Sequence, residues 1–89
     1  MSEKYSNFPD VITVFSANWC PDCKRAKQLL DSQGVEYNLV DIGKDNDAFL
    51  FVEKLTKRVK IPTIIFPDGS IMIEPSNESL KHKLESIVQ

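Results

Sequence analysis

A pair of cysteines separated by two residues is the feature that most constrains how this chain can fold. Cys20 and Cys23 follow an apolar, β-branched run at residues 11–15, and they open a segment whose apolar residues recur at helical spacing. The two cysteines therefore fall at a junction between a buried strand and a helix. A Cys-x-x-Cys sequence at such a junction is typical of a redox-active dithiol.

The residues of the motif favour a thiolate at Cys20. If Cys20 is the N-cap, Pro21 takes the first helical position, where no amide is needed and its restricted φ suits the helix. The free amides of Asp22 and Cys23 then point at the Cys20 sulfur, and the helix dipole adds a positive field. Both effects stabilise the nucleophilic thiolate. We therefore predict that Cys20 attacks a disulfide and that Cys23, nearly one turn further along the same face, resolves the adduct.

A zinc site and a structural disulfide are the alternatives to a redox role. A closed zinc site needs four ligands, and besides the two cysteines the chain has a single histidine, His82, in a segment with the pattern of an exposed helix face. A disulfide that closes so short a loop restrains the unfolded chain very little. The sequence therefore favours a catalytic pair and predicts no metal site.

The length and charge of the chain limit its architecture and its partners. The 89 residues, with a net charge of −2, predict a single domain over residues 1–89, with residues 1–9 as a polar lead-in. A net negative charge does not indicate nucleic-acid binding, and no apolar run is long enough to span a membrane. Residues 1–5 lack the apolar core of a signal peptide. We therefore expect a cytoplasmic protein, in a compartment where thiols stay reduced.

The apolar pattern predicts a strand–helix–strand unit, then a second helix, then a hairpin and a last helix. The expected strands cover residues 11–15, 35–42, 63–66 and 71–73. The expected helices cover residues 21–33, a segment marked by Phe49 to Val59, and a segment capped by Ser76 with Leu80, Leu84, Ile87 and Val88 on its buried side. A compact strand–helix–strand unit implies a parallel pair of strands. The predicted fold class is therefore α/β and thioredoxin-like, a four-stranded mixed sheet (βαβ, α, ββα) flanked by helices on both faces.

Several short motifs resemble those of the glutaredoxin family. They are Cys20-Pro21-Asp22-Cys23 with the basic residues that follow it, Ile61-Pro62-Thr63, and Asp68-Gly69. The resemblance covers nearly the whole chain, and Trp19 before the first cysteine is more similar to the mycoredoxin branch, as are Asp68-Gly69-Ser70 and Pro75-Ser76. It implies that Cys20 is the nucleophile, that Pro62 follows a cis peptide bond, and that the backbone of Ile61 pairs with the substrate.

Trp19 and Asp22 flank the dithiol. We predict that the Trp19 indole is at least partly exposed and contacts the partner, because aromatic residues are favoured at contact surfaces; alternatively, it only packs the loop onto the sheet. Asp22 stands where glutaredoxins commonly carry tyrosine, and a carboxylate there destabilises the Cys20 thiolate, whereas Lys24 and Arg25 act in the opposite direction. Alternatively, Asp22 is a solvated acid that suits the helix dipole.

These inferences predict a thiol–disulfide oxidoreductase that serves cell redox homeostasis. It is expected to act as a monomer on disulfide-containing proteins, or on mixed disulfides with a small thiol. No tightly bound cofactor is expected, and the co-substrate is a low-molecular-weight thiol such as glutathione or mycothiol. The residues expected to bind the substrate or thiol are Trp19, Pro21, Asp22, Ile61 and Pro62.

Two alternative functions and one departure from the family pattern accompany this prediction. The protein could be an electron donor fed by thioredoxin reductase, or an iron-sulfur cluster carrier in which Cys20 from two chains holds the cluster. Cys23 argues against a cluster, because its sulfur competes by forming a disulfide. Glutaredoxins also commonly carry Gly-Gly and then Asp before the last helix, where this chain has Ile73-Glu74 and Ser76.

Overall fold

A four-stranded sheet forms the centre of the computed structural model, which describes residues 11–87. The strands are β1 (Ile12–Ser16), β2 (Tyr37–Asp41), β3 (Thr63–Ile65) and β4 (Ile71–Ile73). In the strand order β2-β1-β3-β4, β1 pairs in parallel with β2 and antiparallel with β3, and β3 and β4 form an antiparallel hairpin. The predicted mixed sheet is therefore confirmed.

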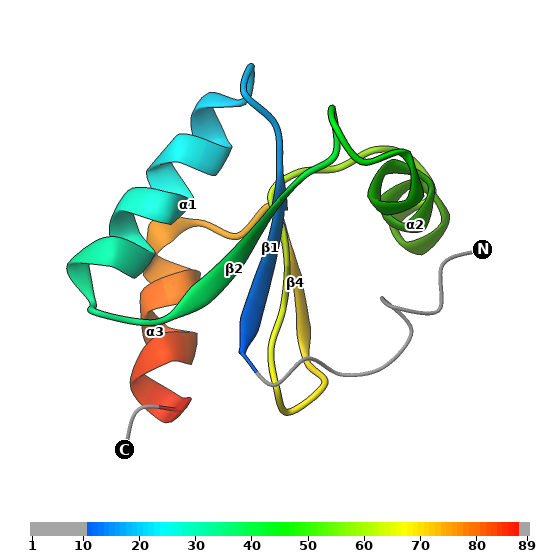
Figure 1. The fold of residues 1–89 in the computed structure, drawn as a ribbon. Coiled ribbons are helices and arrows are strands. Elements are labelled where there is room, and N and C mark those ends of the chain that lie inside the picture. Colours follow the sequence, from blue (N-terminus) through cyan, green and yellow to red (C-terminus); the bar gives the residue numbers. More distant parts are fainter. Residues whose placement is uncertain (1–10, 88–89) are drawn as a thin grey trace.

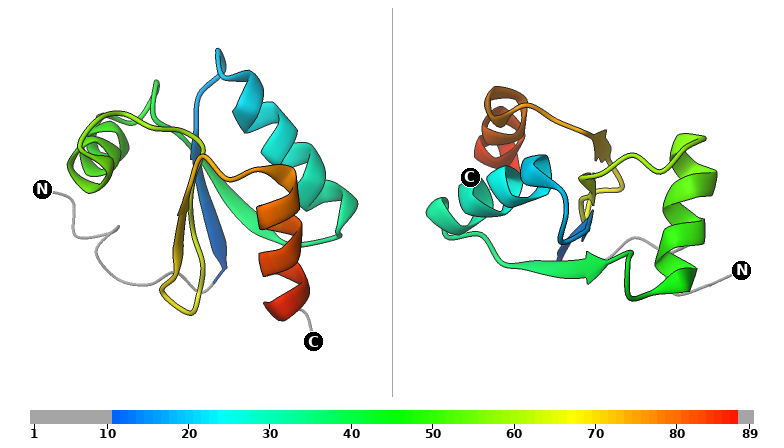
Figure 2. Two further views of the ribbon diagram at one scale, coloured as in Figure 1. Left: turned by 180° about the vertical axis from the view of Figure 1, so that it is seen from behind. Right: turned by 90° about the horizontal axis from the view of Figure 1, so that it is seen from above.

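Three helices cover the two faces of the sheet. They are α1 (Pro21–Ser32), α2 (Asn46–Thr56) and α3 (Asn77–Ile87). Helices α1 and α3 lie on one face and α2 lies alone on the other, as the front view and the view from above both show (Figures 1 and 2). The predicted thioredoxin-like α/β architecture is confirmed. The predicted lead-in at residues 1–9 and the predicted core position Val88 lie outside the described residues.

Apolar side chains fill the space between the sheet and each helical layer. The cluster under α1 and α3 consists of Ile12, Val14, Ala26, Leu30, Ile64, Phe66, Leu80 and Leu84. The cluster under α2 consists of Phe15, Ala17, Ile42, Ala48, Val52 and Ile65. All five residues of β1 are buried, because this strand is central and is covered on both faces.

The second strand is shorter than predicted. We expected it to cover residues 35–42, but β2 begins at Tyr37 and ends at Asp41. The amide of Val35 donates to the Leu30 carbonyl (3.2 Å) and that of Gly34, at φ +66°, donates to the Asp31 carbonyl (3.1 Å). Residues 34 and 35 therefore close the end of α1 instead of joining the sheet.

The second helix also ends earlier than predicted. Val59 was expected on its apolar face, but α2 ends at Thr56 and Lys57 has a left-handed conformation (φ 68°). The Thr56 hydroxyl lies within hydrogen-bond distance of the Val52 carbonyl (2.8 Å) and of the Arg58 carbonyl, and these contacts turn the chain. Val59 still packs against the cluster under α2.

The other ends for which the sequence predicted a bound lie within one residue of it, and α2, for which no first residue was predicted, begins at Asn46. β1 begins at Ile12, α1 ends at Ser32, and β3 ends at Ile65, just before the hairpin turn that the bond from the Phe66 amide to the Ser70 carbonyl closes (2.9 Å). Asp45 caps α2 through a side-chain oxygen, and Ser76 caps α3 in the same way, as expected for Ser76.

The topology places the cysteine motif at the carboxyl end of the central strand. β1 runs into the loop that carries Trp19 and Cys20, at the upper end of the sheet in Figure 1. Within residues 11–87 no helix combines the length and apolar character needed to cross a membrane.

Candidate active site

Cys20 is the N-cap of α1. Its backbone is extended (φ −102°, ψ 104°), Pro21 follows at the first helical position, and the Cys23 amide donates to the Cys20 sulfur at 3.1 Å. This arrangement confirms the predicted cap. The Asp22 amide, expected as a second donor, makes no such bond in the described structure, because the sulfur lies over the third amide of the helix, a usual partner for a capping atom.

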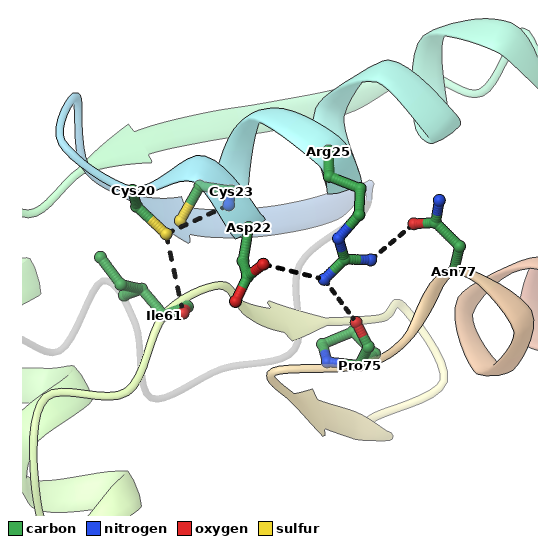
Figure 3. Close-up of polar contacts among 7 residues, drawn as sticks. All are labelled: Cys20, Asp22, Cys23, Arg25, Ile61, Pro75 and Asn77. Atoms are coloured by element: carbon green, nitrogen blue, oxygen red, sulfur yellow. Dashed lines mark hydrogen bonds and ion pairs between the residues drawn. The ribbon is translucent and has the colours of Figure 1, made fainter.

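The carbonyl of Ile61 faces the same sulfur. The Cys20 thiol donates to this oxygen across 3.8 Å, although the two residues are 41 positions apart (Figure 3). The Ile61–Pro62 peptide bond is cis, as the family resemblance implied, and the Pro62 carbonyl accepts from the Glu74 amide (2.8 Å). A carbonyl next to the sulfur favours the protonated thiol, whereas the Cys23 amide favours the thiolate.

Cys23 is the less accessible of the two cysteines. It exposes 1% of its surface, compared with 8% for Cys20, and the two sulfurs lie side by side (Figure 3). Burial, followed by the hydrogen bond with Cys20, raises the pKa of Cys23 from 9.0 to about 12. Cys23 is therefore a protonated thiol at neutral pH.

Arg25 connects the second turn of α1 to the start of α3. Its Nη1 donates to the Asn77 side-chain oxygen (2.6 Å), and its Nη2 donates to the Pro75 carbonyl (3.3 Å) and lies 3.6 Å from an Asp22 oxygen (Figure 3). The sequence pointed to Arg25 as a charged helix residue that acts against Asp22 at the Cys20 thiolate. It contained no signal that Arg25 contacts Asn77 and Pro75, because both are at least 50 positions away.

The Arg25 contact changes what can be expected of Asp22. We expect Asp22→Asn to raise the alkylation rate of Cys20 at low salt by about twofold, because this exposed carboxylate, already paired with Arg25, only weakly destabilises the thiolate. High salt should remove most of the difference, since it screens exposed charges. Glu85→Gln, an exposed acid near the far end of α3, serves as the matched control. Equal alkylation rates of Cys20 in parent and variant at low salt would show that Asp22 is a solvated acid with no effect on the thiolate.

Two further residues singled out by sequence lie on the surface. The Trp19 side chain is 68% exposed, which confirms the expected exposure, while its contact with a partner stays a prediction. His82 is exposed on α3, as expected. Over residues 11–87, the structure brings no three His, Cys, Asp or Glu side chains together in a group that could hold a metal ion.

The fold and this site define a class of protein: a thioredoxin-like domain with a dithiol at the start of its first helix. Known proteins agree with that class. The glutaredoxin family model matches residues 12–71. This chain therefore belongs to the glutaredoxin family, whose members are thiol–disulfide oxidoreductases.

Individual relatives match over most of the chain. A Mycobacterium tuberculosis protein named as a glutaredoxin is 34% identical over 77 residues, which span 85% of this chain and 92% of that protein. Mycoredoxin 1 of Corynebacterium glutamicum is 30% identical over 77 residues, spanning 85% of this chain and 95% of its own. Among solved structures, a mutant of the thioredoxin-like protein BC3987 is similar with a TM-score of 0.76 and 25% identity, covering 86% of this chain and 97% of that one.

Proposed function

We propose that this protein reduces protein disulfides, or mixed disulfides with a low-molecular-weight thiol, by a two-cysteine mechanism. The observation that carries the proposal is the asymmetry of the pair. The Cys20 sulfur accepts from a helix amide at 3.1 Å, whereas Cys23 is buried and has a pKa of about 12. One sulfur is therefore suited to attack while the other stays protonated.

The proposed reaction proceeds in two exchanges. The Cys20 thiolate attacks one sulfur of the substrate disulfide, whose S–S bond breaks, and the other substrate sulfur leaves as a thiolate that takes up a proton. Cys23 then loses its proton and attacks the Cys20 sulfur of the mixed disulfide, which releases the second substrate thiolate. The substrate gains two electrons, and the enzyme is left with a Cys20–Cys23 disulfide.

The first exchange itself activates Cys23. Its pKa is raised by burial, by the hydrogen bond with Cys20, and by the charge of Cys20. Once Cys20 is part of a mixed disulfide, its charge and its thiol proton are gone. Both effects of Cys20 then weaken, whereas burial and the smaller effect of the Asp22 charge remain, so the pKa of Cys23 falls at the step in which its thiolate is needed.

Residues around the sulfurs are suited to hold an extended substrate. We assign binding to Trp19, Pro21, Asp22, Ile61 and Pro62. Within residues 11–87 the Ile61 amide has no hydrogen-bond partner, so it is available to pair with a substrate backbone as in strand addition. A substrate amide that donates to the Ile61 carbonyl would also compete with the Cys20 thiol for this oxygen and so favour the thiolate.

The charges near the site support a thiol co-substrate without carboxylates, of the mycothiol type. Glu74, where glutaredoxins commonly carry glycine, has φ 50° and is exposed next to Pro62, and Asp22 adds a second carboxylate. Arg25 is engaged with Asp22, Pro75 and Asn77. Glutathione carries two carboxylates, which these acids repel. The similarity to mycoredoxin 1 supports the same choice.

Parallel reduction assays test the co-substrate. The substrate is 2-hydroxyethyl disulfide. Its reduction is measured with one of three electron sources: mycothiol, glutathione, or thioredoxin reductase with NADPH. We expect mycothiol to support turnover about fivefold faster than glutathione, as one unfavourable charge contact of about 1 kcal/mol would produce. A faster reaction with glutathione would reverse the assignment of the thiol. Turnover with the reductase alone would identify a reductase-fed donor, and no turnover with any of the three would refute the function.

The remaining sequence predictions are part of the same proposal. A reducing, cytoplasmic setting keeps both thiols available for the reaction. A monomeric single domain leaves the upper end of the sheet, where both cysteines lie, open to a protein substrate.

A further inference from the structure

We infer that Gly43, in the turn between β2 and α2, is a positioning residue that holds the Trp19 indole beside the dithiol as a contact surface for protein substrates. The inference rests on the proposed function, because it assigns Trp19 a substrate to contact. It adds a residue and a turn that no motif of the sequence marks. The evidence is the close approach of the indole to the Gly43 backbone.

The indole occupies the space that a side chain at position 43 would need. A Cβ built on Gly43 would lie 3.1 Å from Cζ3 and 3.3 Å from Cη2 of Trp19. Both distances are shorter than ordinary van der Waals contact between carbon atoms. Any residue other than glycine therefore pushes against the six-membered ring of the indole.

Backbone conformation does not explain a glycine at this position. Gly34 and Gly69 have φ values of +66° and +90°, in the region that favours glycine, but Gly43 lies outside that region. The φ of Gly43 is therefore no reason to exclude an alanine. Glycine is needed at position 43 because a side chain there would have no room beside the indole.

The turn that carries Gly43 is held in place by Asp41. The Asp41 side chain accepts from the Gly43 amide (2.8 Å), and the Asp41 carbonyl accepts from the amides of Lys44 (3.0 Å) and Asp45 (3.1 Å). The same carboxylate oxygen would lie 3.1 Å from a Cβ at position 43. A new side chain would thus be confined between the carboxylate and the indole, and the exposed indole is the group that can move.

A held indole suits a protein substrate. Trp19 is 68% exposed, so most of its surface is available to a partner. Contact with the turn restricts its rotamers before binding, which lowers the entropy lost when the partner arrives. An apolar side chain next to the disulfide of a protein substrate can reach the indole, whereas a small disulfide such as 2-hydroxyethyl disulfide makes much less contact with it.

The test compares Gly43→Ala with the parent, using insulin as protein disulfide and dithiothreitol as reductant. We expect the KM for insulin to rise by about three- to tenfold, as for loss of an aromatic contact, with a change in kcat below about twofold. The KM for 2-hydroxyethyl disulfide should rise less. Trp19 is the only tryptophan, so its fluorescence anisotropy reports the indole directly, and we expect it to fall in the variant. Lys44→Ala, an exposed neighbour in the same turn, should match the parent in every measurement.

A double variant separates positioning from any other role of the turn. In a Trp19→Ala background, Gly43→Ala should not raise the KM for insulin further, because the group it displaces is gone. A further rise in that background, or unchanged anisotropy in the single variant, would overturn the inference. If the parent reduces neither disulfide, the proposed function fails, whereas the anisotropy still tests the contact between Gly43 and Trp19.

Discussion

Cys20→Ser is expected to abolish disulfide reduction, with a fall in kcat/KM of about a thousandfold or more, because a serine hydroxyl cannot replace the thiolate nucleophile. The structure supports this expectation through the N-cap geometry, in which the Cys23 amide lies 3.1 Å from the reacting sulfur. The loss is measured as turnover of insulin and of 2-hydroxyethyl disulfide. A matched thermal unfolding curve should show that the variant is folded.

Cys23→Ser is expected to stop the reaction one step later. Its Cys20 can still attack a disulfide, but the buried partner that releases the substrate is missing, so a mixed disulfide should accumulate and be seen by intact mass. The double variant, without either sulfur, should form no adduct. A Cys23→Ser protein that turns over protein disulfides at the parent rate would refute the two-cysteine mechanism.

The two thiols should differ most in their rates of alkylation by iodoacetamide at neutral pH. The pKa of Cys23 is raised from 9.0 to about 12, which lowers its thiolate fraction about a thousandfold relative to an ordinary cysteine. Only the thiolate reacts, so Cys23 should be labelled slower than a free thiol by about that factor, in addition to its shielding by burial. Cys20, held by a helix amide, should take up nearly all of the label. Peptide mapping of a time course measures both rates.

The pH dependence of this labelling gives a second check. Because burial favours the neutral thiol, the thiolate fraction of Cys23 should increase about tenfold per pH unit up to about pH 12, whereas that of an ordinary cysteine levels off above 9.0. The rates are compared only where the protein is folded. Equal and slow labelling of both cysteines at neutral pH would refute the assignment of Cys20 as the nucleophile.

Local sequence signals were sufficient to predict most of the helices and strands. The apolar, β-branched run at residues 11–15 predicted a buried strand, and Pro21 predicted the start of α1. Each of these signals acts within a few residues of where it stands in the chain. The errors have another source, because the ends of β2 and α2 are set by local hydrogen bonds of Val35 and Thr56, which apolar periodicity does not reveal.

The sequence by itself determined that two thiols stand at the start of a helix behind a buried strand, and therefore which sulfur is suited to attack. Only the tertiary structure decided what surrounds them: the Ile61 carbonyl facing Cys20, the bonds from Arg25 to Asn77 and Pro75, and the Gly43 turn beneath Trp19. The physical reason is distance along the chain. An N-cap is formed by neighbouring residues, whereas these contacts join segments that meet only when the sheet and its helices pack together.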